Sequence, residues 1–397
     1  MIQPLLSIII PSCNRHEYLV PVLRTLLDET CAQIVVSDNS MQSLSVEILE
    51  NLGADGRMVY QHHTQKLSVV ENFERALGLA TGRYLIFIGD DDCVGPCIED
   101  IARWALEEHI DAVVSYQDRF IVNYFWPGVT SKYFGDGYAG KLFVAKYSGE
   151  ARPLNNRLAI LKSARRPGHG LGSMARAYHG IVSRELVERV VTRYGSLFGG
   201  VSPDIYSATL LTYESQSAYI VDFPFVIPGA SAKSTAGEGA ARDDTDRLYG
   251  RDHIQRFGEA LLWDERIPAF YSPITVWAFS QQQALDRLGD SSLSIDFPRL
   301  YLRCALHSYA HRLAVIASIR HWLKTASGFR LILGMLTAFG AEVISQFRRV
   351  WYRFITPPRA FTDLSTVGDA HIALKHYCEP WRRVEVSSSQ INSPSSS

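Results

Sequence analysis

Residues Leu67–Pro96 read LSVVENFERALGLATGRYLIFIGDDDCVGP, and this stretch decides the fold class that we predict. Apolar residues recur at helical spacing over Val69–Ala80, and Gly82 is a typical helix stop. The apolar run Tyr84–Ile88 then has the length and composition of a buried strand. Three adjacent aspartates follow it directly. The stretch therefore predicts a helix, a buried strand and a carboxylate cluster at the carboxyl end of that strand.

The alternation of helix and strand patterns continues on both sides of this stretch. Such alternation predicts a mostly parallel sheet with helices on both faces, and ligands of such sheets bind beyond the carboxyl ends of the strands. Helical spacing dominates again from Pro298 to Phe354. The further elements predicted before Tyr116 are strands at Leu5–Ile10, Gln33–Ser37, Met58–Gln61 and Asp111–Ser115, and helices at Glu17–Glu29, Leu44–Leu52 and Cys97–Glu108.

A chain of 397 residues suffices for one large α/β domain and a smaller addition. The stretch Gly229–Ala241 reads GASAKSTAGEGAA, a composition typical of a mobile loop. The predicted organisation is an α/β domain over 1–230 with halves 1–115 and 116–230, a loop with connecting helices over 231–297, a helical region over 298–386, and a disordered Ser-rich tail over 387–397.

Composition is that of an ordinary folded, soluble protein. The chain is 47% hydrophobic with a formal net charge of -1, so nothing in its overall charge favours nucleic acid as a partner. Its six cysteines lack metal-ligand spacing, which favours free thiols in a reducing cytoplasm. The N-terminus lacks the pattern of a signal peptide, and no uninterrupted apolar run of about 18 residues predicts a spanning helix.

The carboxylates of Asp90, Asp91 and Asp92 repel one another where the buried strand ends. Their proximity costs stability unless a cation or hydrogen-bond donors compensate the charge. Mg²⁺ or Mn²⁺ is a suitable cation, because such an ion takes few carboxylates and leaves positions open for phosphate oxygens. An acidic turn that caps the helix beginning near Pro96 explains the triplet equally well.

Other phosphate-binding devices are absent from the expected place. The first strand is followed by Pro11–Arg15 (PSCNR), with neither a G-x-G-x-x-G motif nor a P-loop. Dinucleotide and ATP cradles are therefore disfavoured, and so is a nucleotidyltransferase, for which we expect a Gly-rich, basic first loop. The remaining interpretation is that the carboxylates hold a metal ion that binds a diphosphate.

Three ordered segments resemble the N-terminal half of family 2 glycosyltransferases, which have the GT-A fold. They are Leu6–Arg15 (LSIIIPSCNR), Ile34–Ser40 (IVVSDNS) and Leu67–Pro96. The resemblance is strong over residues 5–115 and weak up to about residue 230. It implies a nucleotide-sugar donor, typically a UDP-sugar, with Mn²⁺ or Mg²⁺ as cofactor. It also implies a glycan or lipid-linked acceptor, in bacterial surface-polysaccharide assembly.

The resemblance also implies roles for single residues. Pro11, Ser12 and Arg15 match the loop that holds the nucleotide, and Asp38 matches the aspartate that accepts a hydrogen bond from the base. Asn72 lies on the preceding helix face and could reach the nucleotide. For Asp38 a plain turn residue, and for Asn72 an ordinary polar helix position, remain alternatives.

The resemblance implies a different role for each aspartate of the acidic triplet. It implies that Asp90 contacts ribose, that Asp91 is the principal metal ligand and that Asp92 lies close to the metal. Family members more often have an aspartate at the position of Gly89, so the roles could shift by one residue.

An inverting transfer needs a general base on a segment other than the metal site. By resemblance this base is Asp204, in the Ser-Pro-Asp sequence of a predicted helix start, with Glu185 and Asp222 as weaker candidates. The alternative is that Asp204 only interacts favourably with the helix dipole.

Three further residues are candidates for diphosphate or acceptor contacts. His179 precedes a predicted helix, and a structural histidine is the alternative. Lys233 and Ser234 lie in the Gly/Ala-rich loop, where a lysine beside hydroxyls suits a phosphate clamp, or else belongs to a solvated linker.

The C-terminal region is basic. Residues 301–359 hold nine Lys or Arg and one acid, Glu342. With this charge, an apolar stripe at helical spacing favours a helix in a membrane interface over residues 329–354. Packing of the stripe on the rest of the chain, or on a second subunit, is the alternative. The stripe comprises Phe329, Ile332, Leu336, Phe339, Val343, Phe347, Val350 and Phe354.

Taken together, the sequence predicts a cytoplasmic, inverting, metal-dependent glycosyltransferase, which is peripheral on the inner face of the membrane if residues 329–354 lie in the interface. A catalytically inactive glycan-binding or scaffold subunit is the alternative from another class. Such a subunit would tolerate loss of the triplet or of Asp204, and this chain has both.

Overall fold

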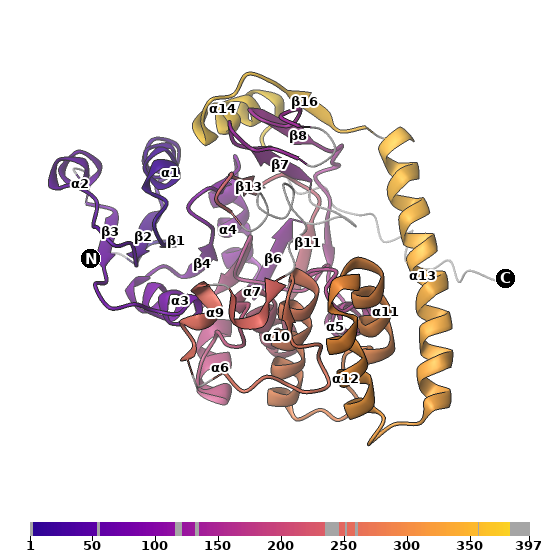
Figure 1. Cartoon of the computed structure of the whole chain (residues 1–397). Helices are drawn as coiled ribbons and strands as arrows, with labels where there is room; N and C mark the ends of the chain where they lie inside the picture. The colour runs from indigo at the N-terminus through magenta and orange to yellow at the C-terminus, as the bar shows by residue number, and fades with distance from the viewer. Residues whose placement is uncertain are drawn as a thin grey trace.

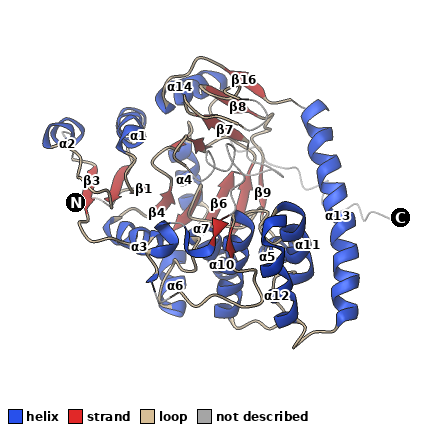
Figure 2. Cartoon of the chain, viewed as in Figure 1, coloured by secondary structure: helices blue, strands red, loops and turns tan. Residues whose placement is uncertain are grey.

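The computed structural model describes residues 3–53, 56–115, 121–131, 135–234, 246–250, 252–258, 261–355 and 357–381. A twisted sheet lies in the middle of the molecule, and helices lie on both of its sides (Figures 1 and 2). The predicted disordered tail, residues 387–397, and the second part of the predicted mobile loop, residues 235–241, lie outside the described residues.

The central sheet has eight strands in the order β3-β2-β1-β4-β10-β6-β11-β9. Strands β1 to β4 run parallel to one another, and so do β6 and β11, whereas β10 and β9 run antiparallel to their neighbours. The predicted α/β class with a mostly parallel sheet is confirmed. The strands are β1 Leu6–Ser12, β2 Gln33–Asp38, β3 Met58–His62, β4 Tyr84–Phe87, β6 Ala112–Ser115, β9 Ala151–Pro153, β10 Gly180–Ser183 and β11 Ala218–Val221.

Strand β1 shows why the sheet is sandwiched between helices. All seven of its residues are buried, as expected for a strand covered on both faces. Ile8 and Ile10 pack into one apolar cluster with α1 and α4, while Ile9 packs into another with α3, α6 and α7. These helices are α1 His16–Glu29, α3 Val69–Leu79, α4 Ile98–Glu107, α6 Arg184–Tyr194 and α7 Pro203–Glu214; α2 Val46–Gly53 lies between β2 and β3.

The chain after residue 115 adds a small sheet and a helical layer. The small sheet has the order β13-β7-β8-β16, in which β7 and β8 pair antiparallel. Helices α5, α10, α11 and α12 share a separate apolar cluster beside α7. The elements are β7 Val122–Phe125, β8 Lys141–Val144, β13 Gly229–Ala230, β16 Arg359–Phe361, α5 Asn156–Ala164, α9 Asp252–Gln255, β14 Asp246–Arg247, β15 Phe270–Tyr271, α10 Pro273–Leu288, α11 Phe297–His307 and α12 Arg312–Trp322.

The end of the described chain returns to its beginning. Strand β16 completes the small sheet, and α14, Val367–Tyr377, packs against α1 (Figure 1). His371 hydrogen-bonds the carbonyl oxygen of Val94 at 2.9 Å, and Lys375 pairs with Glu29 at 2.6 Å. The region predicted as helical over 298–386 thus ends, within the described residues, in a strand and a helix that pack on the small sheet and on α1.

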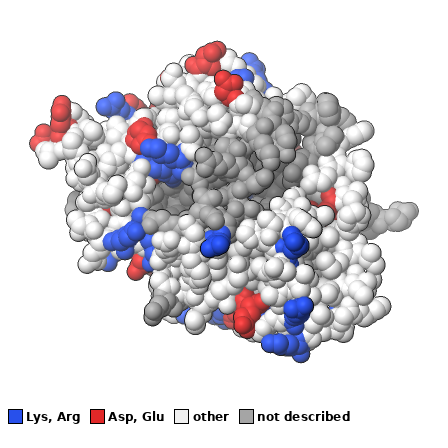
Figure 3. All heavy atoms as spheres, viewed as in Figure 1, with Lys and Arg blue, Asp and Glu red and all other residues white. Residues whose placement is uncertain are grey.

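Between these two parts runs α13, Gly328–Ile355, along one edge of the molecule (Figure 1). In Figure 3 the lower part of this edge is largely uncharged, and Lys and Arg side chains gather where α12 and α13 meet. The helix is fixed to the body by Glu342, which accepts hydrogen bonds from Arg299 of α11 at 2.7 and 2.9 Å. His169 contacts the same carboxylate at 2.9 Å.

The protonation states of Glu342 and His169 determine which ion pair holds α13. Burial raises the pKa of Glu342, but hydrogen bonds from His169 and Arg299 outweigh it and lower the pKa to about 2. Burial and the nearby Arg303 lower the pKa of His169 to about 4. His169 is therefore neutral at pH 7, and the ion pair that holds α13 is the one between Arg299 and Glu342.

Acidification is expected to weaken the fold through His169. Its pKa is about 4 in the folded protein against 6.5 as reference, so the unfolded chain takes up the proton first and stability falls as pH drops from 6.5 towards 4. Between about pH 7 and pH 5 this linkage costs on the order of 2 kcal/mol. Urea unfolding of the parent and of His169→Gln at both pH values measures it. Equal pH dependence of the two proteins would contradict the assignment.

Candidate active site

The predicted nucleotide residues lie where an open α/β sheet binds ligands. Strand β1 lies between β2 and β4, so the strand order changes direction beside it, and crevices form at such points. Ser12 ends β1, Asp38 ends β2, and Asp90 comes shortly after β4. The fold therefore brings together three segments that are far apart in the sequence.

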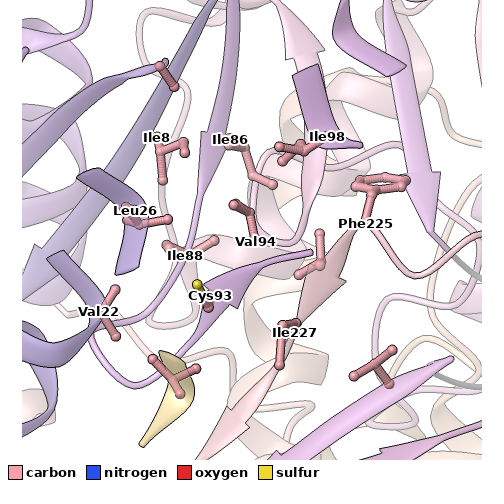
Figure 4. Close-up of a cluster of buried hydrophobic side chains, with 14 of the residues drawn as sticks. Ile8, Val22, Leu26, Ile86, Ile88, Cys93, Val94, Ile98, Phe225 and Ile227 are labelled. Atoms are coloured by element: carbon pink, nitrogen blue, oxygen red, sulfur yellow. The ribbon is translucent and has the colours of Figure 1, made fainter. Parts of the chain in front are cut away.

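The backbone of the triplet is held by apolar packing on both sides. Ile88 before it and Cys93 and Val94 after it are fully buried in the cluster of Figure 4. Strand β5, Cys93–Val94, pairs antiparallel with β12, Val226–Ile227, which Figure 4 shows beside it. Sequence analysis missed both short strands, because two residues carry no detectable periodicity.

The carboxylate of Asp90 is paired with other groups of the protein. Its side chain is fully buried, accepts a hydrogen bond from the Ser12 hydroxyl at 2.8 Å and forms an ion pair with the Arg15 guanidinium. Burial raises the pKa of Asp90, Arg15 opposes this rise, and the neighbouring Asp91 adds to it. Ser12, Arg15 and Asp90 thus form one cluster that joins the loop after β1 to the acidic triplet.

Asp92 uses both of its carboxylate oxygens within the protein. Oδ1 accepts from the Gly229 amide at 2.7 Å. Oδ2 accepts from the Gly89 amide at 2.6 Å, from the Tyr178 hydroxyl at 2.9 Å and from His179 Nε2 at 2.6 Å. Despite burial, His179 and these hydrogen bonds lower the pKa of Asp92. The carboxylate is therefore ionised but saturated, which does not suit the predicted metal contact.

Asp91 differs from its neighbours. Oδ2 accepts from the Ser231 amide at 3.0 Å and lies 3.6 Å from Arg15, and the main-chain oxygen accepts from the Trp126 indole at 2.8 Å. Burial raises the pKa of Asp91, and Arg15 and hydrogen bonds from the amide and side chain of Ser231 oppose the rise. Among the described residues, the hydrogen bond whose acceptor atom is resolved goes to Oδ2 and not to Oδ1. Of the three aspartates, Asp91 therefore has the carboxylate oxygen available to an added cation.

The described residues contain no group of three or more His, Cys, Asp or Glu side chains that could hold a metal by themselves. They do fit an ion that is shared with a substrate. Mg²⁺ in phosphate-binding sites is commonly held by one or two carboxylates and by substrate phosphates. Asp91 can supply one such ligand, whereas Arg15 and His179 already compensate much of the charge of Asp90 and Asp92.

Asp38 is likewise held by protein donors. Its Oδ1 accepts from the Ser40 amide at 2.9 Å and from the Ser40 hydroxyl at 2.5 Å. Its Oδ2 accepts from the Tyr60 hydroxyl at 2.6 Å and lies 2.8 Å from His16 Nε2. Burial alone would raise the pKa of Asp38, but these hydrogen bonds lower it. A base that binds this carboxylate would replace or share one of these donors.

Asn72 joins two strand ends. Its carbonyl oxygen accepts from the Ser37 hydroxyl at 2.7 Å, and its amide donates to the main-chain oxygen of Ser12 at 3.1 Å. It is buried, and these contacts position the loop after β1. Pro11 lies within β1, fully covered by its neighbours.

The segment 229–234 folds over the triplet. Gly229 approaches so closely that a Cβ atom there would lie 1.8 Å from the main-chain oxygen of Asp91. Ser234 hydrogen-bonds Ser231 within the segment, and the exposed Lys233 pairs with Glu17 of α1 at 2.5 Å. These residues, predicted as the start of a mobile loop, are tied to the site through main-chain contacts.

Asp204 lies at the first turn of α7, as predicted. Its Oδ1 accepts from the Ser202 hydroxyl at 2.6 Å. Burial raises the pKa of Asp204, and the hydrogen bond from Ser202 and the charge of His179 oppose the rise. His179, held at φ 62° beside β4, interacts with both Asp92 and Asp204 and thus links the triplet with the predicted base.

Sequence reasoning missed several residues that build this site. Tyr178 and Trp126 gave no motif, and Ser231 and Gly229 act through main-chain amides. The glycine that opens the GASAKS stretch was the only available signal, because a glycine can mark a close approach of two backbones. The weaker base candidates lie elsewhere: Glu185 is exposed, and Asp222 accepts hydrogen bonds from Ser148.

Residues 7–158 match the model of glycosyl transferase family 2. The match includes β1 to β4, the acidic triplet and Asp38. The match spans the segments on which the resemblance to this family rests in the sequence.

Curated relatives match about a third of the chain. A "PGL/p-HBAD biosynthesis glycosyltransferase" from Mycobacterium bovis is 28% identical over 135 residues, which are 32% of this chain and 52% of the relative. A protein of the same name from Mycobacterium tuberculosis matches equally. The chain spans about half the length of the curated relatives it matches.

Solved structures of glycosyltransferases are similar at low identity. S. aureus TarS 1–349 in complex with UDP-GlcNAc has a TM-score of 0.43 and 12% identity, covering 85% of this chain and 80% of that one. The mannosyltransferase PcManGT from Pyrobaculum calidifontis, in complex with GDP-Man and Mn2+, has a TM-score of 0.38 and 14% identity, covering 95% and 87%. Scores at this level do not establish a shared function.

Proposed function

We propose that this protein is a glycosyltransferase that transfers a sugar from a nucleotide-sugar donor to a glycan or lipid-linked acceptor. The single observation that carries the proposal is the placement of the family 2 motifs around the β1–β4 crevice. Ser12, Arg15, Asp38 and Asp90–Asp92 come from separate segments of the family 2 match and lie at adjacent strand ends. A UDP-sugar as donor, and surface-polysaccharide assembly as context, extend the resemblance.

In this proposal Asp91 holds the metal. Its free Oδ1 and the donor diphosphate would share one Mn²⁺ or Mg²⁺. When bound, such an ion stabilises the charge of the departing diphosphate. Arg15 adds a fixed positive charge beside Asp90 and Asp91. Asp92, saturated by its donors, positions Tyr178 and His179 and does not bind the ion.

Asp204 is the general base in the same proposal. It comes from α7, a different segment from the triplet, as an inverting transfer requires. Burial moves its pKa upwards from the ordinary value, which strengthens the carboxylate as a proton acceptor. It would take the proton of the acceptor hydroxyl as that oxygen attacks the anomeric carbon. Lys233 forms an exposed ion pair with Glu17. In this proposal it approaches the diphosphate only after that ion pair breaks.

One observation favours a second candidate. Arg15, His179, Tyr178 and several amides already compensate the triplet, so the charge repulsion alone no longer calls for a metal. If no metal binds, the arrangement suits a protein that binds a nucleotide-sugar without catalysing transfer. The two candidates differ in whether Mn²⁺ strengthens donor binding.

A thermal-shift screen of UDP- and GDP-sugars with and without Mn²⁺ tests the proposal. A donor at a hundredfold excess over its Kd raises the free energy of unfolding by about 2.7 kcal/mol. We expect a shift that requires Mn²⁺ in the parent and is lost in Asp91→Asn. Asp100→Asn, an exposed acid on α4, is the matched control and should retain the shift. A metal-independent shift in all three proteins would refute the role of Asp91.

A further inference from the structure

Helix α13 has two unlike faces. Its inner face packs on the protein, with Ala338 and Glu342 buried. Gly334 comes so close to α11 that a Cβ atom there would lie 2.7 Å from the Pro298 side chain. Arg166 adds a hydrogen bond to Ser345 at 3.2 Å. This face therefore fixes the orientation of the helix about its own axis.

The outer face is apolar and exposed. Phe329, Leu336 and Phe347 are 74%, 66% and 72% exposed. They belong to the stripe found in the sequence, whose members with described side chains all point away from the body. The alternative that the stripe packs on the rest of this chain is therefore wrong. The other exposed apolar residues of α13 are Ile332, Leu333, Phe339, Val343, Ile344 and Trp351.

A patch of this kind is unusual for a protein that is only in contact with water. Within α13, residues 328–347 are also long and apolar enough to cross a membrane by length and composition, although only 11% of that stretch is buried. Arg330 and Glu342 lie within this stretch, which is why the sequence shows no uninterrupted apolar run there.

The exposed charge carried by α12 and α13 has one sign, and the exposed Glu265 pairs with His321 of α12 at 3.0 Å. The Lys and Arg residues from 309 to 347 are all exposed, and the single acid there, Glu342, is buried in its ion pair. The sequence has three more arginines in the last turns of the helix, at positions 348, 349 and 353. The exposed cations with described side chains are Arg312, Arg320, Lys324 and Arg330.

We propose that the outer face of α13 lies in the surface of a bilayer that contains anionic lipids, with the helix axis in the membrane plane. Apolar side chains would enter the boundary between headgroups and acyl chains, and the neighbouring cations would contact acidic headgroups. The proposal holds whatever reaction the protein catalyses, because it rests on α12 and α13 alone.

Two other occupants fit the observations less well. A spanning helix would have to leave α11 and carry Glu342 into the hydrocarbon without Arg299, which is costly. A second copy of this chain would bring another set of cations to a face on which α12 and α13 themselves carry no exposed acid, so that Glu265 beside His321 would have to balance them.

Vesicle co-sedimentation of the full-length protein tests the proposal. We expect binding to phosphatidylcholine vesicles that contain phosphatidylglycerol, and weaker binding to phosphatidylcholine alone. Leu336→Glu with Phe347→Glu should abolish binding to both. Arg320→Gln with Lys324→Gln should weaken binding to the anionic vesicles by roughly fivefold per cation removed. Gln346→Glu, an exposed site beside the stripe, is the control for added charge and should bind far better than the double glutamate variant.

A second measurement keeps the proposal testable if the double variant unfolds. Trp351 is 66% exposed, and its emission should shift to shorter wavelength when anionic vesicles are added, as a difference between the parent and Trp351→Phe. Unchanged emission together with unchanged sedimentation of the stripe variants would overturn the proposal. A dimer in solution that the stripe variants dissociate would assign the face to a second copy. Resistance of the membrane-bound protein to alkaline carbonate would assign it to a spanning helix.

Discussion

Replacing Asp204 by asparagine is expected to lower kcat for sugar transfer by roughly 10²- to 10⁴-fold, the usual contribution of a general base. Donor affinity, measured by calorimetry, should change little, because Asp204 lies on α7 and contacts Ser202 rather than the triplet. The substitution keeps the size of the side chain and its place at the helix start, so the fold should persist.

Glu185→Gln is the matched control for Asp204→Asn. Both acids lie in the first turn of a helix, but Glu185 is exposed on α6. If Asp204 only interacts with the helix dipole, the two variants will have similar, nearly normal turnover.

The pH profile provides a second test of the base. Because the pKa of Asp204 is raised, parent activity should fall on acidification at a pH above the ordinary range of an aspartate. A profile that Asp204→Asn leaves unchanged in shape would contradict the assignment.

Replacing Gly229 by alanine is expected to damage the site more than the addition of a methyl group at any other position in it. The new Cβ would meet the main-chain oxygen of Asp91 at 1.8 Å, so one of two backbones must move. Movement would break the hydrogen bonds that the Gly229 amide donates to Asp92 and the Ser231 amide donates to Asp91. Two hydrogen bonds to carboxylates correspond to about 3–6 kcal/mol of stability before the site relaxes.

The expected readouts are a lower denaturation midpoint and loss of the donor-induced thermal shift. Gly78→Ala is the control, because Gly78 lies in α3 with no atom near its absent Cβ. Alanine there should stabilise the protein by about 0.5–1 kcal/mol. If Gly229→Ala is as harmless as the control, segment 229–234 does not hold the triplet in solution.

The first domain could be read largely from local sequence patterns. The predicted strand Leu5–Ile10 and the observed β1, Leu6–Ser12, differ by one or two residues at each end. The predicted helix Val69–Ala80 agrees with α3, and its start is fixed by a capping box between Ser68 and Glu71. Such elements depend on residues that are neighbours in the chain, so their period is visible in one sequence.

The site was only partly predictable. Sequence order brought Ser12, Asp38 and the triplet to adjacent strand ends, and the structure agrees with that placement. Their hydrogen-bond partners were not predictable: Tyr178 and His179 reach Asp92 from across 86 and 87 positions, and Gly229 from across 137. No local pattern encodes contacts over such separations.

The C-terminal helix shows the same division. Spacing in the sequence correctly grouped Phe329, Leu336 and Phe347 on one stripe, because a helix repeats every 3.6 residues. Whether that stripe faces protein or solvent depended on Glu342, whose partners Arg299 and His169 lie on other elements.

By itself, the sequence determined the alternating α/β architecture, the strand ends that carry the functional side chains, and the likeness to family 2 glycosyltransferases. Tertiary structure decided which carboxylates are already saturated, that Asp91 retains a free oxygen, and which face of α13 is exposed. The physical reason is that periodicity and capping act between near neighbours, whereas the charge state and availability of a buried aspartate depend on donors that only the completed fold brings within 3 Å or so of it.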